Sequence, residues 1–180
     1  MYPVPRLLWQ FWRHRSDPPL APGEVHVSRH LCLPWDIDLW MELNNGRTLT
    51  LFDMGRMPFA RRSGMIAAMR ANGWGLAMAG GSVRWRRRIR MFERIEMRTR
   101  LLGWDERFLY MEQEMRVRGE SAAHLLARGA VTAPGGRGIV PPGRVAGAMG
   151  LDAASPPLPE WAAAWIAADA LRPWPPAMPA

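Results

Sequence analysis

The feature that most constrains the fold of this chain is a helical pattern of apolar residues that begins at Asn45. Apolar side chains cover most of its circumference, and they include Leu49, Leu51, Phe52, Met54 and Phe59. A helix that is apolar on nearly every side must be enclosed by other elements. Pro58 removes one backbone hydrogen bond, so we expect it to kink or end the first part of the helix. A second short helix is expected from about Met65 to Ala71, before Asn72-Gly73.

Runs bounded by turn residues predict strands on both sides of this helix, and apolar and polar residues alternate in Val25–Leu33, Arg94–Leu102 and Arg107–Arg118. One run precedes it, and four follow it: Val25–Leu33, then Leu76–Arg90, Arg94–Leu102, Arg107–Arg118 and Ser121–Thr132. Gly80-Gly81 indicates a bulge in the second run. Such strands form antiparallel sheets with one face on a core and one face polar. The sequence therefore predicts an α+β fold, in which a curved antiparallel sheet wraps around one long central helix.

Three regions differ in composition. Residues 1–23 are rich in proline and are expected to form an N-terminal arm, and residues 24–133 carry the predicted sheet and helix. Residues 134–180 form a Pro/Gly-rich C-terminal extension with a short helix near 160–171, where Trp161, Trp165 and Ile166 share one side. We expect Pro173 to Ala180 to be a loose tail.

The charge balance points to anionic partners. The formal net charge is +8, and all 24 basic residues are arginine. Excess positive charge favours binding to nucleic acid, acidic membranes or phosphorylated molecules. No nucleic-acid motif accompanies the arginines, so binding to a specific nucleic acid is not predicted. The arginine-only composition, with many Ala, Gly, Pro and Trp residues, is typical of a GC-rich bacterial genome. The single cysteine, Cys32, excludes an intrachain disulfide and favours a reducing, cytoplasmic location.

The N-terminal run Leu7-Leu8-Trp9-Gln10-Phe11-Trp12 is apolar but short. Its positive charges, Arg13 and Arg15, follow it instead of preceding it, so it does not resemble a signal peptide. No apolar run approaches the length of a membrane span. Residues 7–15 either contact a membrane surface weakly or pack on the domain, and packing is the default interpretation.

Two acids stand ahead of the helix start. Asp36 and Asp38 precede Asn44-Asn45-Gly46. The first N–H groups of a helix have no partner inside it and lie at its positive end, so they suit a developing oxyanion. A neighbouring acid then serves as base or nucleophile. The alternative is structural: the acids are turn residues, and Asn44 or Asn45 caps the helix.

The segment from Asp38 to Leu49, Asp-Leu-Trp-Met-Glu-Leu-Asn-Asn-Gly-Arg-Thr-Leu, resembles the signature of hot-dog acyl-CoA thioesterases of the 4-hydroxybenzoyl-CoA thioesterase type. The segment from Glu96 to Arg107, and Pro156-Pro-Leu-Pro-Glu160 before a Trp-bearing helix, are similar to the thioesterase-superfamily-member-six group. This resemblance implies that Asp38 attacks the thioester carbonyl or activates water, and that the Asn45 amide polarises the thioester oxygen. Asn44, Gly46 and Arg47 would shape the substrate-binding helix entry.

The resemblance also implies assembly and partners. Such enzymes are homodimers or homotetramers with active sites at the dimer interface, and acyl-CoA is the substrate. The CoA nucleotide would lie against basic side chains, for which Arg86 and Arg88 are candidates, although a solvated or subunit-contacting charged face is the alternative. No cofactor is implied. His14, His26, His30 and His124 show no metal-ligand spacing, so no metal site is predicted.

Two positions depart from the family signature. Glu42 stands where the signature has histidine, and Thr48 stands where it has an aromatic residue. A second carboxylate beside Asp38 either makes a better base or marks a site that has lost activity. The leading hypothesis is therefore an acyl-CoA thioesterase with Asp38, Asn45 and Glu42 as catalytic candidates. The alternative is a catalytically weak hot-dog module that binds acyl-CoA or serves in assembly or at membranes. A hot-dog dehydratase is a third and lesser hypothesis, because the histidine-bearing motif is absent.

Overall fold

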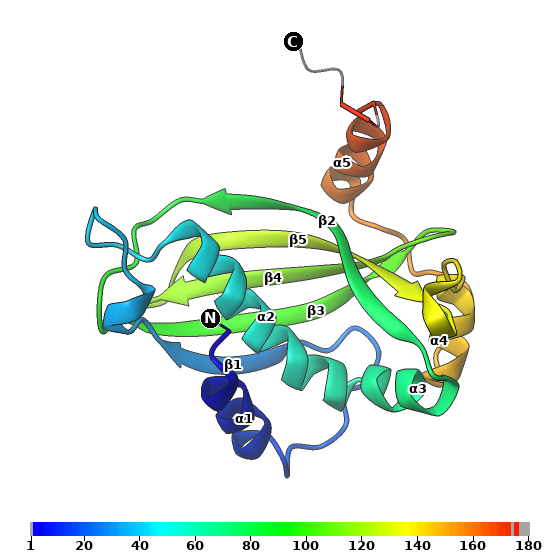
Figure 1. Ribbon diagram of the computed structural model, residues 1–180, viewed down its shortest axis with the longest axis horizontal. Coiled ribbons are helices and arrows are strands. Elements are labelled where there is room, and N and C mark those ends of the chain that lie inside the picture. Colours follow the sequence, from blue (N-terminus) through cyan, green and yellow to red (C-terminus); the bar gives the residue numbers. More distant parts are fainter. Residues whose placement is uncertain (1, 174, 177–180) are drawn as a thin grey trace.

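The computed structural model describes residues 2–173 and 175–176 (Figure 1). Its strands are β1 (His26–Leu31), β2 (Gly75–Trp85), β3 (Arg94–Trp104), β4 (Leu109–Val117) and β5 (Glu120–Thr132). Its α-helices are α1 (Val4–Arg13), α2 (Asn45–Arg62), α3 (Met65–Asn72), α4 (Pro142–Ala148) and α5 (Glu160–Ala170). Two short 3-10 helices, η1 (Pro34–Asp36) and η2 (Pro134–Gly136), complete the described elements.

The five strands form one antiparallel sheet in the order β1-β3-β4-β5-β2. The sheet curves across α2, which lies along its concave face (Figure 1). The expected α+β hot-dog architecture is thereby confirmed. The bulge expected at Gly80-Gly81 is also present, because the register between β2 and β5 shifts between Met78 and Gly80.

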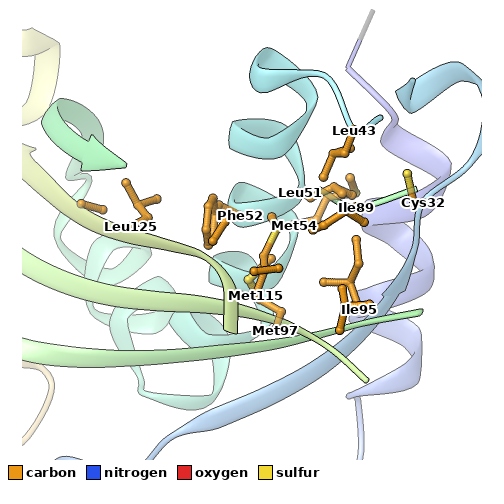
Figure 2. Close-up of a cluster of buried hydrophobic side chains, with 14 of the residues drawn as sticks. Cys32, Leu43, Leu51, Phe52, Met54, Ile89, Ile95, Met97, Met115 and Leu125 are labelled. Carbon is orange, nitrogen blue, oxygen red and sulfur yellow. The ribbon is translucent and has the colours of Figure 1, made fainter. Parts of the chain in front are cut away.

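The main core lies between α2 and the sheet (Figure 2). From the helix, Leu51, Phe52 and Met54 are at most 1% exposed. They face buried residues of β3, β4 and β5: Ile95, Met97, Met115 and Leu125. Each such side chain contributes about 1.5–3 kcal/mol through removal of apolar surface from water. The enclosure of α2 therefore fixes where its N-terminus emerges.

The alternative that the helix ends at Pro58 is wrong, because α2 continues through Pro58 to Arg62. A proline inside a helix costs about 3 kcal/mol, but Pro58 lies within a stretch whose neighbours are buried against the sheet. Packing outweighs the lost hydrogen bond. The helix ends before Gly64, whose φ of 79° places it in the left-handed region.

The two ends of the chain hold helices that the sequence patterns did not predict. The expected N-terminal arm contains α1, which packs against α2, and the C-terminal extension contains α4. The predicted terminal helix is present as α5, with Trp165 and Ile166 packed on the outer face of the sheet. Trp161 meets the ring of His124 on β5 edge-on, with centroids 5.3 Å apart, and is 44% exposed. The expected loose tail at Pro173–Ala180 lies largely outside the described residues.

Among the described residues, no helix has the length and apolar character needed to cross a membrane.

Candidate active site

The segment before α2 is anchored by Asp36, which is 1% exposed. Its Oδ2 accepts hydrogen bonds from Arg6 Nη1 at 2.6 Å and from the Leu33 N–H at 3.0 Å. Its Oδ1 accepts from Arg47 Nε at 3.2 Å. Asp36 is therefore a structural residue that ties α1 and the first turn of α2 to this segment. Arg47, predicted to bind substrate, is committed to the same anchor.

Asp38 opens a tight loop that closes at Glu42. The Asp38 N–H donates to the Glu42 carbonyl at 2.9 Å. Its Oδ1 accepts from the N–H groups of Trp40 at 2.8 Å and Glu42 at 3.4 Å. Met41 adopts a φ of 58° within this loop. One carboxylate oxygen of Asp38 therefore holds the turn, whereas Oδ2 has no protein hydrogen bond within the part of the chain that the structure describes.

The start of α2 follows directly. Asn44 is the N-cap, and its Oδ1 accepts from the N–H groups of Gly46 at 2.9 Å and Arg47 at 3.2 Å. Two of the orphan donors of the helix are satisfied in this way. The N–H of Asn45 has no acceptor among the described residues. Of the Asn45-Gly46 pair expected to hold an oxyanion, only Asn45 keeps a free donor at the positive end of the helix dipole.

A pocket of about 180 Å³ opens beside this helix start. It brings together four of the predicted residues, Glu42, Asn45, Arg86 and Arg88. Asp38, Asn44, Gly46 and Arg47 do not line it. Thr48 and Trp85 also line the pocket. Their positions in the sequence could have indicated that these two residues belong to the site. Thr48 lies one turn after the N-cap, and Trp85 ends β2 within the arginine-rich run.

Glu42 is ion-paired inside this pocket. Its Oε2 lies 3.0 Å from Arg88 Nε, yet this buried oxygen accepts no aligned hydrogen bond from any residue that the structure describes. The contact is therefore a charge pair that leaves the oxygen able to accept from a bound molecule. A short bridge to Arg90 and the hydrogen bond from the Leu43 N–H to the Ile89 carbonyl, 2.8 Å long, fix the Glu42 backbone. The pocket thus combines a helix N-terminus, a carboxylate and three arginines, Arg86, Arg87 and Arg88.

A separate group of side chains has the geometry of a possible metal site, although the spacing of the histidines in the sequence predicted none. Ligand atoms of His14, Asp17 and His26 lie within 4.8 Å of one another. However, Nη1 of Arg62 lies 2.9 Å from His26 Nδ1 and 3.6 Å from Asp17 Oδ2. The guanidinium supplies the positive charge here, and this cluster fastens the N-terminal arm to the end of α2.

Comparison with known proteins identifies relatives of this architecture. The family model described as the thioesterase-like superfamily matches residues 32–166. The protein THEM6 of Xenopus laevis is 41% identical over 88 residues, which are 49% of this chain and 42% of that protein. THEM6 of Drosophila melanogaster is 33% identical over 85 residues, 47% of this chain and 44% of that protein. The chain thus spans less than half the length of these relatives. Both are animal proteins, so they do not support the bacterial source expected from the composition.

Solved structures show the same fold. The probable thioesterase YbaW of Escherichia coli superposes with a TM-score of 0.64 at 13% identity, covering 68% of this chain and 95% of that one. The DHNA-CoA thioesterase of Staphylococcus aureus gives a TM-score of 0.60 at 15% identity, covering 82% of this chain and 92% of that one. At these identities the likeness concerns the fold.

Proposed function

Because the chain belongs to the thioesterase-like superfamily, we propose that it hydrolyses the thioester bond of an acyl-CoA to a free acid and CoA. The observation that carries this proposal is the N–H of Asn45 at the start of α2, which has no acceptor among the described residues, in a pocket that also holds a carboxylate and three arginines. An oxyanion needs such a donor, and an anionic substrate needs the cations.

The carbonyl oxygen of the substrate would accept a hydrogen bond from Asn45, which polarises the carbonyl carbon. The Asp38 carboxylate, through its free Oδ2, would take a proton from water as the hydroxyl oxygen attacks that carbon. Collapse of the tetrahedral intermediate would break the carbon–sulfur bond and expel the CoA thiolate, which the proton neutralises. Direct attack by Asp38, followed by hydrolysis of the anhydride, gives the same products.

Glu42 would provide a second carboxylate beside Asp38. Its ion pair with Arg88 fixes the carboxylate at the pocket wall. Arg86 is exposed at the pocket mouth, and no acidic partner for its side chain is present among the described residues. Arg86 and Arg88 would therefore contact the phosphates of CoA, since guanidinium groups match phosphate geometry.

Assembly as a homodimer or homotetramer is part of this proposal. β2 is an edge strand of the sheet, and exposed edges invite pairing with another chain. Leu76, Met78 and Trp85 expose 42–52% of their surface along this strand. Because Trp85 and Arg86 also line the pocket, a partner at β2 would help complete it. A cytoplasmic location, favoured by the single buried Cys32, is likewise proposed.

A second candidate is a hot-dog module that binds acyl-CoA without turnover. It is favoured by two observations: Glu42 replaces the signature histidine and is neutralised by Arg88, and Oδ1 of Asp38 is committed to its own turn.

A panel of acyl-CoA esters of different chain lengths, including aromatic acyl groups, separates the two candidates. Thiol release is followed with a chromogenic thiol reagent, and binding of the same esters is measured by calorimetry. We expect thiol release above the uncatalysed rate for at least one ester. Binding of the esters without thiol release would select the binding module.

A further inference from the structure

Helix α1 turns its polar side inward. Arg6 donates to Asp36 at 2.6 Å and to the Leu31 carbonyl at 2.8 Å. Gln10, 4% exposed, donates to the Arg29 carbonyl at 3.0 Å. His14 bonds Asp17 at 2.6 Å. These residues recur every four positions, so one polar stripe fastens the helix to the domain.

The opposite side of α1 is apolar and faces solvent. Leu8, Trp9 and Trp12 are 60%, 52% and 53% exposed. The two indole rings stack with centroids 4.8 Å apart, so they form one continuous patch. Single exposed apolar residues are common on protein surfaces. Several large apolar residues gathered on one exposed helix face instead mark an interaction surface.

A basic hollow adjoins this patch. It measures about 700 Å³ and lies between α1, β1, β3 and the turn after β4, with Trp9 on its wall. Six arginines line it: Arg6, Arg13, Arg29, Arg94, Arg116 and Arg118. Among the described residues that line it, Glu96 is the sole acid, and it pairs with Arg98 at 2.8 Å.

Three of these arginines have charges that the protein does not neutralise. Arg13, Arg29 and Arg94 are exposed, and their guanidinium groups meet no carboxylate within the described part of the chain. The Gln10 Oε1 atom, buried at the wall of the hollow, also accepts no hydrogen bond from the residues described. The hollow therefore presents guanidinium groups and the unbonded amide oxygen of Gln10 next to an aromatic surface.

We propose that α1 docks the protein on the surface of a membrane that contains anionic phospholipids. Leu8, Trp9 and Trp12 enter the interfacial region, where indole rings and aliphatic side chains are favoured. Arg13, Arg29 and Arg94 contact lipid phosphates in and around the hollow. A second copy of this chain is a poorer occupant, because it would bring the same uncompensated positive charge against this face. The docking is peripheral and independent of thioester hydrolysis.

Sedimentation with vesicles tests the proposal on the full chain. Vesicles of phosphatidylcholine alone are compared with vesicles that also contain phosphatidylglycerol. We expect binding to the mixed vesicles that weakens as salt is added, and little binding to phosphatidylcholine alone. Trp9→Ala with Trp12→Ala should weaken binding, and Arg13→Gln with Arg94→Gln should weaken it about five-fold for each arginine.

Matched controls separate this surface from general properties of the chain. Trp161→Ala removes a comparably exposed tryptophan on α5, and Arg137→Gln removes an exposed arginine outside the hollow. Both should bind vesicles as the unmodified chain does, and circular dichroism should show every variant folded. Inorganic phosphate and free ADP are added as soluble competitors.

Four outcomes would overturn the proposal. These are equal binding to both kinds of vesicle, no vesicle binding, equal losses in the control variants, and binding of phosphate or ADP without vesicle binding. A change of oligomeric state in the tryptophan variant, measured by light scattering and without loss of vesicle binding, would assign the patch to a second copy instead.

Discussion

At the scale of single residues, two buried histidines make the fold sensitive to acid. Burial, with nearby cations such as Arg6, lowers the pKa of His30 to about 3. Burial, with His14 and Arg62, lowers the pKa of His26 to about 4. His30 is held as a neutral ring, because Gln10 Nε2 lies 3.4 Å from its Nδ1 and Ser28 Oγ lies 2.9 Å from its Nε2.

The unfolded chain takes up these protons near the ordinary histidine pKa, whereas the folded chain does not. Their contribution to stability is therefore complete above about pH 6.5 and is lost as the pH falls toward about 4 for His26 and about 3 for His30. We predict that the free energy of unfolding decreases by up to about 1.4 kcal/mol per pH unit for each histidine in this range. Urea denaturation between about pH 7 and pH 5 measures it. His30→Gln should reduce the slope, and a stability independent of pH would contradict the account.

At the scale of elements, the close approach of α2 to β3 depends on Gly55. A Cβ at this position would lie 2.5 Å from Met97 Cγ and 3.4 Å from Ser28 Oγ. Alanine normally stabilises a helix interior by about 1 kcal/mol relative to glycine. Here overpacking opposes that gain, so we predict that Gly55→Ala destabilises the protein by about 1–3 kcal/mol.

Gly147 in α4 is the matched control, because a Cβ there meets no atom within 4 Å. Gly147→Ala should be neutral or slightly stabilising. Thermal unfolding of both variants checks the pair, and equal effects at the two positions would show that the contact with Met97 does not limit the approach.

The observed helices and strands also show which structural features the sequence patterns predicted. Each predicted strand is present, but β2 ends at Trp85 and the predicted continuation to Arg90 is wrong. Where residues alternate, the pattern reports directly which face meets the core, whereas the arginine run after Trp85 carries no such signal. Helix α1 was missed because its apolar face points outward and its polar residues bind the domain. The path of α2 through Pro58 was missed because tertiary burial decides it.

The candidate site was also predictable only in part. Asn45 and Glu42 come from one short segment, so their proximity follows from the motif. Their meeting with Arg86 and Arg88 depends on how the end of β2 returns to α2, which no local pattern specifies. The turn that engages Asp38 depends on the left-handed backbone of Met41, and methionine gives little signal for that conformation.

At the scale of the whole molecule, the proposed assembly uses the open edge of β2. In the proposed dimer, Leu76→Glu with Met78→Glu would bring like charges together on adjacent strands. We predict a shift from dimer to monomer and a lower rate of hydrolysis, measured by light scattering and thiol release. Leu171→Glu, at a residue 85% exposed beyond α5, should leave the assembly intact. An unchanged dimer in the β2 variant would place the interface elsewhere.

In the proposed function, thioester hydrolysis occurs at the start of α2 and depends on the Asp38 carboxylate. The most direct measurement is kcat/KM for the best acyl-CoA ester with Asp38→Asn, beside Glu106→Gln, which changes an exposed acid in the turn between β3 and β4. We predict that Asp38→Asn lowers kcat/KM by about 10²–10⁴-fold while acyl-CoA binding and oligomeric state are retained, and that Glu106→Gln has no effect. Full activity in a folded Asp38→Asn protein would contradict the account.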